Sequence, residues 1–152
     1  MSSTPVIRRA TPHDLEALAT LFDAYRRFYE QPADLPKARA FMGARLGHGD
    51  SVVFVAEADA AGELAGFTQL YPTFCSVAAA PIYVLYDLFV DASARQGGVA
   101  RALMRAAEAH GRSTGAARLD LSTAHTNTRA QALYESLGWK RDELYRTYSL
   151  EL

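Results

Sequence analysis

Residues 82–100 read IYVLYDLFVDASARQGGVA, an apolar run that leads through a short polar loop into an alanine-rich segment. The run at 82–90 is rich in β-branched and aromatic residues. With strict alternation, Leu85 and Phe89 would share one apolar face, and Val84, Tyr86 and Leu88 the other. A strand that is apolar on both faces is predicted to lie in the middle of a sheet. The segment at 99–113 is predicted to be a helix.

The loop between this strand and this helix has the composition of a phosphate-binding site. A helix start carries unpaired N–H groups and a partial positive charge, both of which attract phosphate. Glycine allows close backbone approach, and Arg95 can add charge-assisted hydrogen bonds. These features alone support a phosphate-binding loop and an ordinary strand-to-helix turn equally. A Walker A loop and a dinucleotide-binding loop are both excluded, because Gly-Lys-Ser/Thr and the spaced triple glycine are missing.

Along the rest of the chain, segments with the alternating apolar pattern of strands are followed by segments with the apolar spacing of helices. This order predicts an α/β (α+β mixed) domain around one mixed sheet. Pro72 is expected to break its strand, because proline cannot donate to a β-ladder. No internal repeat or linker interrupts the pattern, so a single domain over residues 1–152 is expected. The further strands are expected at 6–9, 51–57, 64–71, 119–122 and, as a pair, within 139–152, and the further helices from Thr11 to about 28, at 35–46 and at 126–137.

Composition narrows the class of protein. The net charge is −1, with 16 basic and 17 acidic side chains, which gives no reason to expect nucleic acid or an anionic membrane as a partner. No apolar run approaches the roughly 18–20 residues of a membrane span. The first residues lack the charged and apolar regions of a secretory signal, so a cytoplasmic protein is expected. The one cysteine, Cys75, lies in no nucleophile motif, so a buried or incidental thiol is favoured.

Two motifs resemble those of one enzyme family. Arg95, Gly98 and Ala100 fill the fixed positions of Arg/Gln-x-x-Gly-x-Gly/Ala, and the segment resembles the acetyl-CoA signature of the GNAT N-acetyltransferases. Residues 127–139 read NTRAQALYESLGW, which is similar to the family's Asn…Ala…Tyr…Gly-Phe/Trp helix. The first strand and helix also fit, so the resemblance covers nearly the whole chain. Residues 85–90 are most similar to the branch with polyamine acetyltransferases and HPA-type enzymes.

The resemblance implies a splayed, mixed central sheet with helices on both faces. It implies an N-acetyltransferase that moves an acetyl group from acetyl-CoA, without a metal, to a primary amine. The acceptor would be a small molecule, such as a polyamine or an amino acid, or a peptide amine, and the protein would be a homodimer. The residues implied in cofactor binding are Leu88, Phe89, Val90, Arg95, Gln96, Gly97, Gly98, Val99, Ala100 and Asn127.

The catalytic residues that the resemblance implies are less complete. Tyr134 would protonate the departing thiolate, although its helical spacing alone favours a core tyrosine. Tyr86 and Ser122 stand where some relatives have a glutamate base. Asp87 remains a candidate for catalysis or substrate binding, because a carboxylate in so apolar a strand is costly unless it is paired or used. The alternative is a structural carboxylate that is hydrogen-bonded to a neighbouring loop.

The acceptor is expected beside the first helices, where Tyr25, Tyr29 and Tyr86 are the candidate substrate-binding residues. The alternative is that these aromatic side chains belong to the core or to its rim. Two other functions stay open. One is a non-catalytic acetyl-CoA sensor or subunit of the same fold. The other is an unrelated nucleotide-binding module in which Asp91 would be the acidic ligand.

Overall fold

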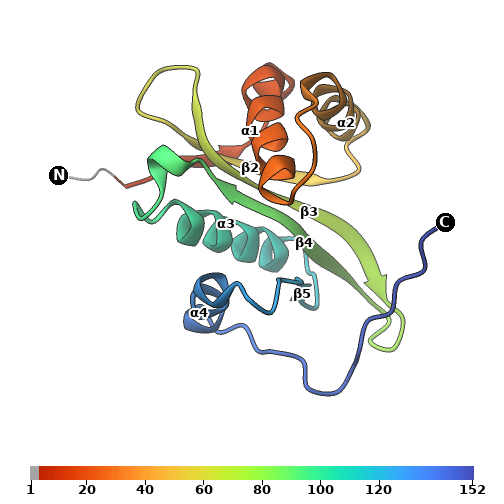
Figure 1. Ribbon diagram of the computed structural model, residues 1–152. Coiled ribbons are helices and arrows are strands. Elements are labelled where there is room, and N and C mark those ends of the chain that lie inside the picture. Colours follow the sequence, from red (N-terminus) through yellow and green to blue (C-terminus); the bar gives the residue numbers. More distant parts are fainter. Residues whose placement is uncertain (1–3) are drawn as a thin grey trace. The chain divides into compact units, whose positions relative to one another are not determined.

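A computed structural model describes residues 4–152, which form two compact units, one ending at Leu121 and one spanning Ser122 to Leu152. A five-stranded mixed sheet in the order β1-β2-β3-β4-β5 is the centre of the first unit (Figure 1). β4 pairs with β3 antiparallel and with β5 parallel, so the central place expected for this strand is confirmed. The strands are β1 (Ile7–Arg9), β2 (Val52–Glu57), β3 (Leu64–Cys75), β4 (Ala80–Val90) and β5 (Leu119–Asp120).

Helices cover both faces of this sheet, as the resemblance implies. The helices α1 (Leu15–Phe28) and α2 (Leu35–His48) lie on one face, and α3 (Val99–Ser113) lies on the other (Figure 1). A cluster of buried side chains joins α1 and α2 to the sheet through Phe67, and a second cluster joins α3 to it through Leu103. The site described below therefore rests on a sheet that is packed on both sides.

A capping box formed by Thr11 and Asp14 precedes α1. A short 3-10 turn, η1 (Pro12–Asp14), precedes the helix. The Asp14 carboxylate accepts a hydrogen bond from the Thr11 backbone N–H at 2.8 Å. Arg8 donates two further bonds to this carboxylate, each at 2.8 Å. The Arg8 guanidinium is the main reason why the pKa of Asp14 is lowered to about 2.

Pro72 does not end its strand, contrary to the sequence prediction. β3 continues to Cys75, and Pro72 pairs with Tyr83 of β4. The ladder between β3 and β2 ends at Leu70, so β3 has a neighbouring strand on one side only at Pro72. A proline is tolerated at such an edge, because its missing N–H removes no ladder hydrogen bond on the open side.

Gly66 brings β3 close to the end of β4. A Cβ atom built there would lie 2.7 Å from the backbone oxygen of Phe89. We expect Gly66→Ala to lower the free energy of unfolding by about 1–3 kcal/mol, because the contacted atom is backbone and cannot swing away. Urea unfolding would measure this. Gly47→Ala in α2 is the control, since nothing lies within 4 Å of a Cβ there, and it should leave stability equal or raised. An equal effect of the two substitutions would contradict the expectation.

The second unit contains the helix α4 (Thr128–Ser136). The pair of strands predicted within 139–152 is wrong, because these residues, all of them described, form no strand. Leu144, Tyr148 and Leu150 are exposed. An isolated two-stranded hairpin is marginal in water, and alternating apolar residues supply no partner strand by themselves.

Candidate active site

β4 contains a β-bulge at Tyr86. In the ladder with β3, Gln69 pairs with Asp87 and Leu70 pairs with Leu85, which leaves Tyr86 as an extra residue. Because Gln69 and Leu70 are adjacent, their partners Asp87 and Leu85 lie on opposite faces of the sheet. The bulge corrects the expectation of strict alternation, since Leu85 and Phe89 do not share a face.

The bulge makes the two sides of β4 chemically different. The Tyr86 side chain is 67% exposed, whereas Asp87 is only 4% exposed. Leu88 and Val90 pack toward the α3 cluster. The parallel ladder to β5 pairs only Tyr83 and Val84 among the described residues, so the backbone from 85 to 90 continues past the end of β5. This is the splay that the resemblance implies for the central strand.

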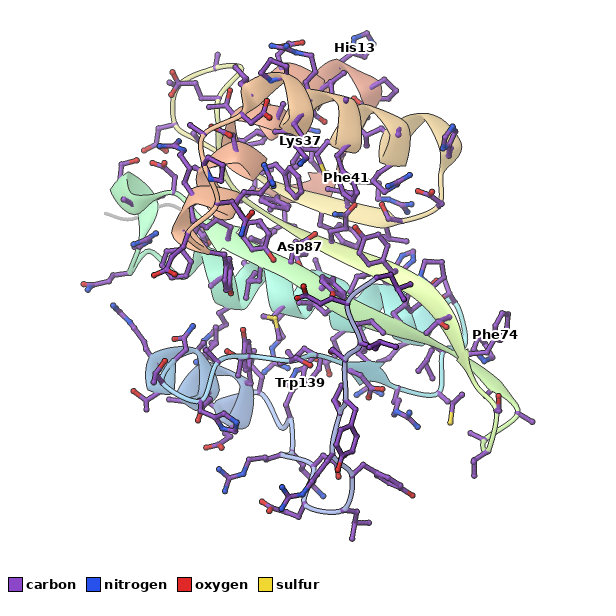
Figure 2. All side chains as sticks on the ribbon, turned by 45° about the vertical axis from the view of Figure 1, so that its right-hand side comes forward. His13, Lys37, Phe41, Phe74, Asp87 and Trp139 are labelled. Carbon is purple, nitrogen blue, oxygen red and sulfur yellow. The ribbon has the colours of Figure 1, made fainter. Side chains whose placement is uncertain are left out.

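Asp87 accepts a hydrogen bond from a buried polar partner. The Gln69 Nε2 atom donates to Asp87 Oδ2 at 2.6 Å, and the Tyr25 hydroxyl lies near the carboxylate. Burial raises the pKa of Asp87 above its usual 3.8, while Gln69 first and then Tyr25 oppose that rise. Asp87 lies on the same side of the sheet as Phe41 of α2 (Figure 2). Because its pKa is raised, the Asp87 carboxylate takes up a proton more readily than an ordinary aspartate, which suits a general base.

Tyrosines from three elements gather around this carboxyl. The Tyr25 hydroxyl of α1 donates to the backbone oxygen of Tyr86 at 3.4 Å. The Tyr25 ring meets the ring of Tyr29 edge-on at 5.1 Å, and the Tyr86 ring meets the ring of Tyr71 in the same way at 5.6 Å. Of the three predicted substrate-binding residues, Tyr25 and Tyr86 therefore lie next to Asp87, and Tyr29 lies against Tyr25. Tyr25 also packs on the core, which agrees with part of the alternative reading.

Burial and the charge of Asp87 raise the pKa values of two nearby tyrosines, Tyr25 and Tyr71. Burial first, and then the charge of Asp87, raise the pKa of Tyr25 above its usual 10. The same two causes raise the pKa of Tyr71 to about 12. Both hydroxyl groups therefore keep their protons at neutral pH and can donate hydrogen bonds.

Sequence reasoning missed Gln69, Ser51 and Tyr71. Gln69 and Thr68 form a polar pair within an otherwise apolar strand. Because buried polar side chains need hydrogen-bond partners, this pair was a signal that a polar cluster lies nearby. Ser51 carries no comparable signal, since a serine before a strand is common in turns.

The loop after β4 leaves the first backbone N–H groups of α3 without a side-chain cap. Gly98 is the N-cap residue of α3, with φ of 80°, and Gln96 also has a positive φ, of 70°. No side chain caps this helix start, and its first turn holds no acidic residue. The first N–H groups of α3 are therefore available to an anion, which is the property that the pyrophosphate of coenzyme A requires.

Arg95 is fixed at the mouth of this loop. Its Nε atom donates to the backbone oxygen of Val90 at 3.2 Å, and its guanidinium lies 5.8 Å from the centre of the Phe89 ring. Within the same loop, Asp91 caps the short turn η2 (Ala92–Ala94), because its side chain accepts a hydrogen bond from the backbone N–H of Ser93. Asp91 is thus engaged within its own loop. This argues against the alternative in which it binds the ribose or Mg²⁺ of a nucleotide.

Asn127 and Tyr134 belong to the second unit. Asn127 caps α4, because its Oδ1 atom accepts a hydrogen bond from the backbone N–H of Ala130 at 3.2 Å. The Tyr134 ring lies 6.3 Å from the Trp139 ring, and the Trp139 backbone N–H bonds the Tyr134 backbone oxygen. No residue of α4 is buried.

Comparison with known proteins identifies the class to which this fold and site belong. Residues 15–139 match the family described as "Acetyltransferase (GNAT) family". The chain belongs to the GNAT family and is an N-acetyltransferase, a member of a family that uses acetyl-CoA.

Several relatives match over nearly their whole length. "Uncharacterized N-acetyltransferase YhfO" of Bacillus subtilis (strain 168) is 45% identical over 146 residues, which are 96% of this chain and 97% of the relative. A "Probable acetyltransferase" of Haemophilus influenzae is 29% identical over 95% of this chain and 96% of its own. The crystal structure of a probable acetyltransferase superposes with a TM-score of 0.91, at 37% identity over 97% of each chain.

Proposed function

We propose that this enzyme transfers an acetyl group from acetyl-CoA to the primary amine of a small molecule, with Asp87 as the proton acceptor. The observation that carries this proposal is a buried carboxyl with a raised pKa beside tyrosine hydroxyls, on the bulged strand that leads into the cofactor loop. Acetyl-CoA, when bound, supplies the acetyl group as a thioester. The backbone N–H groups at 88–90 and at the start of α3 would hold it, together with Arg95.

The amine must lose a proton before it can attack. An alkylamine has a pKa of about 10.4, so it is almost entirely protonated at neutral pH. Only 4% of Asp87 is exposed, and the Tyr25 hydroxyl lies near its carboxylate. We expect Tyr25 to donate its own proton to Asp87 while it accepts one from the amine, so that its charge does not change.

Tyr134 would supply the second proton of the reaction. It would donate from its hydroxyl to the departing sulfur, and the ordinary tyrosine pKa of about 10 is suited to that role. Asn127 would contribute to coenzyme A binding. Its Oδ1 atom is used in the cap of α4, so the amide nitrogen is the group that remains to donate.

The acceptor amine would be bound among Tyr25, Tyr29 and Tyr86. Aromatic faces and a buried carboxylate both favour a cation, which supports a polyamine or an amino acid of the kind used by the polyamine and HPA-type branch. A peptide amine would use the same groups. No helix within residues 4–152 is long and apolar enough to cross a membrane. The exposed apolar residues of 139–152 support a homodimer, because a second chain could cover them.

Thermal unfolding with and without ligands tests the proposal. Acetyl-CoA and coenzyme A should each raise Tm, because a ligand that binds only the native state stabilises it, whereas ATP and NAD should not. Release of free thiol from acetyl-CoA with a panel of amines then tests catalysis. A shift of Tm without thiol release from any amine would favour the alternative of an acetyl-CoA sensor or subunit of the same fold.

Gly98 offers a sharp test of the cofactor loop. We expect Gly98→Ala to raise the KM for acetyl-CoA about 10-fold, because φ of 80° strains an L-residue and shifts the first N–H groups of α3. Gly62 is the matched control, since it also has φ of 80° and nothing lies within 4 Å of a Cβ there. Gly62→Ala should cost a similar amount of stability and leave that KM unchanged. Equal KM values for the two variants would rule out the assigned role of the loop.

A further inference from the structure

Gln69 is a fully buried residue that joins Asp87 to a second polar side chain. Its Nε2 atom donates to Asp87 Oδ2 at 2.6 Å, and its Oε1 atom accepts from the Ser51 hydroxyl at 2.7 Å. The remaining N–H of the amide faces the Met42 sulfur at 3.8 Å. All polar atoms of Gln69 are therefore satisfied without solvent.

While Asp87 is ionised, these partners allow only one orientation of the Gln69 amide. If the amide were flipped, its oxygen would face the Asp87 carboxylate and its NH₂ group would face the Ser51 oxygen. The first contact would set two acceptors against each other at a buried position, where an unmade hydrogen bond is expensive. The ionised carboxylate thus fixes the amide with Nε2 toward Asp87 Oδ2, and the Ser51 hydroxyl completes the arrangement by donating to Oε1. The other carboxylate oxygen is not bonded by Gln69.

We propose that Gln69, held by Ser51, is a positioning residue that keeps the Asp87 carboxylate oriented toward Tyr25 and ready to accept the proton of the amine. This inference rests on the proposed function. The proton passes from the ammonium nitrogen to the Tyr25 oxygen as the Tyr25 proton passes to Asp87, which leaves a neutral amine and a neutral carboxylic acid. Gln69 touches neither substrate and acts only through Asp87.

Besides Gln69, the charged and titratable groups around Asp87 could also shift its pKa. Tyr25 approaches it from α1, Tyr71 from β3 and Tyr86 from β4 itself. From α2, Met42 contacts Gln69 and carries no charge. The next charges are those of the Arg45–Asp50 ion pair, whose effect reaches Tyr71. Tyr25 and Tyr71 both keep their protons near pH 7, because their pKa values are raised, so Gln69 is the main polar influence that a substitution can remove.

The test is the dependence of kcat/KM on pH in Gln69→Leu. Removing the donor should raise the pKa of Asp87, so the acid limb should move to higher pH by about one to two units. Activity should approach that of the unsubstituted enzyme once the pH exceeds the new limb. Gln69→Glu keeps the shape but places a second carboxyl beside Asp87, so the two should titrate as a pair and the higher of their pKa values should move the limb to higher pH. Acid limbs that coincide with the unsubstituted enzyme's in both variants would overturn the proposal.

Thr68→Val separates positioning from a loss of packing. Thr68 is as buried as Gln69, and its hydroxyl donates to the backbone oxygen of Asp87 at 2.8 Å rather than to the carboxylate. This variant should lose stability and keep its acid limb in place. If its limb moved as far as that of Gln69→Leu, a general disturbance of the strand would explain both results and the proposal would fail.

A second readout does not depend on catalysis. The Asp87 carboxyl carbon can be titrated by ¹³C NMR, with its signal assigned from Asp87→Asn. A higher midpoint in Gln69→Leu than in the unsubstituted protein supports the positioning role even if no amine in the panel is acetylated, and an unchanged midpoint overturns it. Failure of the proposed function and failure of this inference are therefore distinguishable.

Discussion

Tyr134→Phe should lower kcat by about 10²-fold or more and leave the KM for acetyl-CoA nearly unchanged. The substitution removes one oxygen, which is the proton donor to the departing sulfur, and general acid catalysis typically contributes about 10²- to 10⁴-fold. Because the ring remains, its contact with Trp139 and the backbone bond between the two residues should persist. Steady-state kinetics with a reactive amine would measure the effect.

The matched control is Tyr148→Phe, which removes the same atom from a side chain that is 89% exposed. It should leave kcat unchanged. If Tyr134→Phe reduced Tm and kept kcat, the hydroxyl would be a structural group. That result would support the alternative that Tyr134 is a packing residue. A loss of kcat at unchanged Tm is the result that a catalytic acid requires.

Local patterns predicted most of the fold. Alternating and helical periods placed the strands and helices of the first unit, because one face of each element had to be buried. The strand 82–90 was predicted to be central because it is apolar on both faces, and β4 is central. Pro72 was misjudged, because the end of the β2 ladder at Leu70 is a property of the sheet and not of the local sequence.

The candidate site was predictable only where a residue type carries its own signal. Gly98 and Arg95 are unusual in a strand-to-helix turn, and Asp87 is unusual in an apolar strand, so both features stood out. The bulge at Tyr86 did not, because it depends on which residue of β3 opposes which residue of β4. Gln69 and Asp87 are 18 positions apart, and only that register brings the two side chains together. The carboxyl could thus be predicted, but its partner could not.

Asp87→Asn should lower kcat/KM at neutral pH by about 10²-fold or more, because an amide cannot accept the proton of the amine. The variant keeps the shape of the side chain. Its amide oxygen can still accept from Gln69 Nε2, and its NH₂ group can donate to Tyr25. The acid limb that belongs to Asp87 should disappear from the pH profile, which steady-state kinetics across pH would reveal.

Although Asp87→Asn should lower activity, it should leave the stability of the protein equal or higher. Burial raises the pKa of Asp87, which means that the ionised carboxylate is less favourable in the folded protein than in the unfolded chain. The aspartate therefore lowers the free energy of unfolding at neutral pH and loses this effect as the pH falls through the raised pKa. A neutral asparagine should leave Tm equal or higher at pH 7, and the difference should vanish in acid. A variant that lost activity and stability together would assign Asp87 a structural role, whereas lost activity at equal or higher stability is what a strained catalytic group predicts.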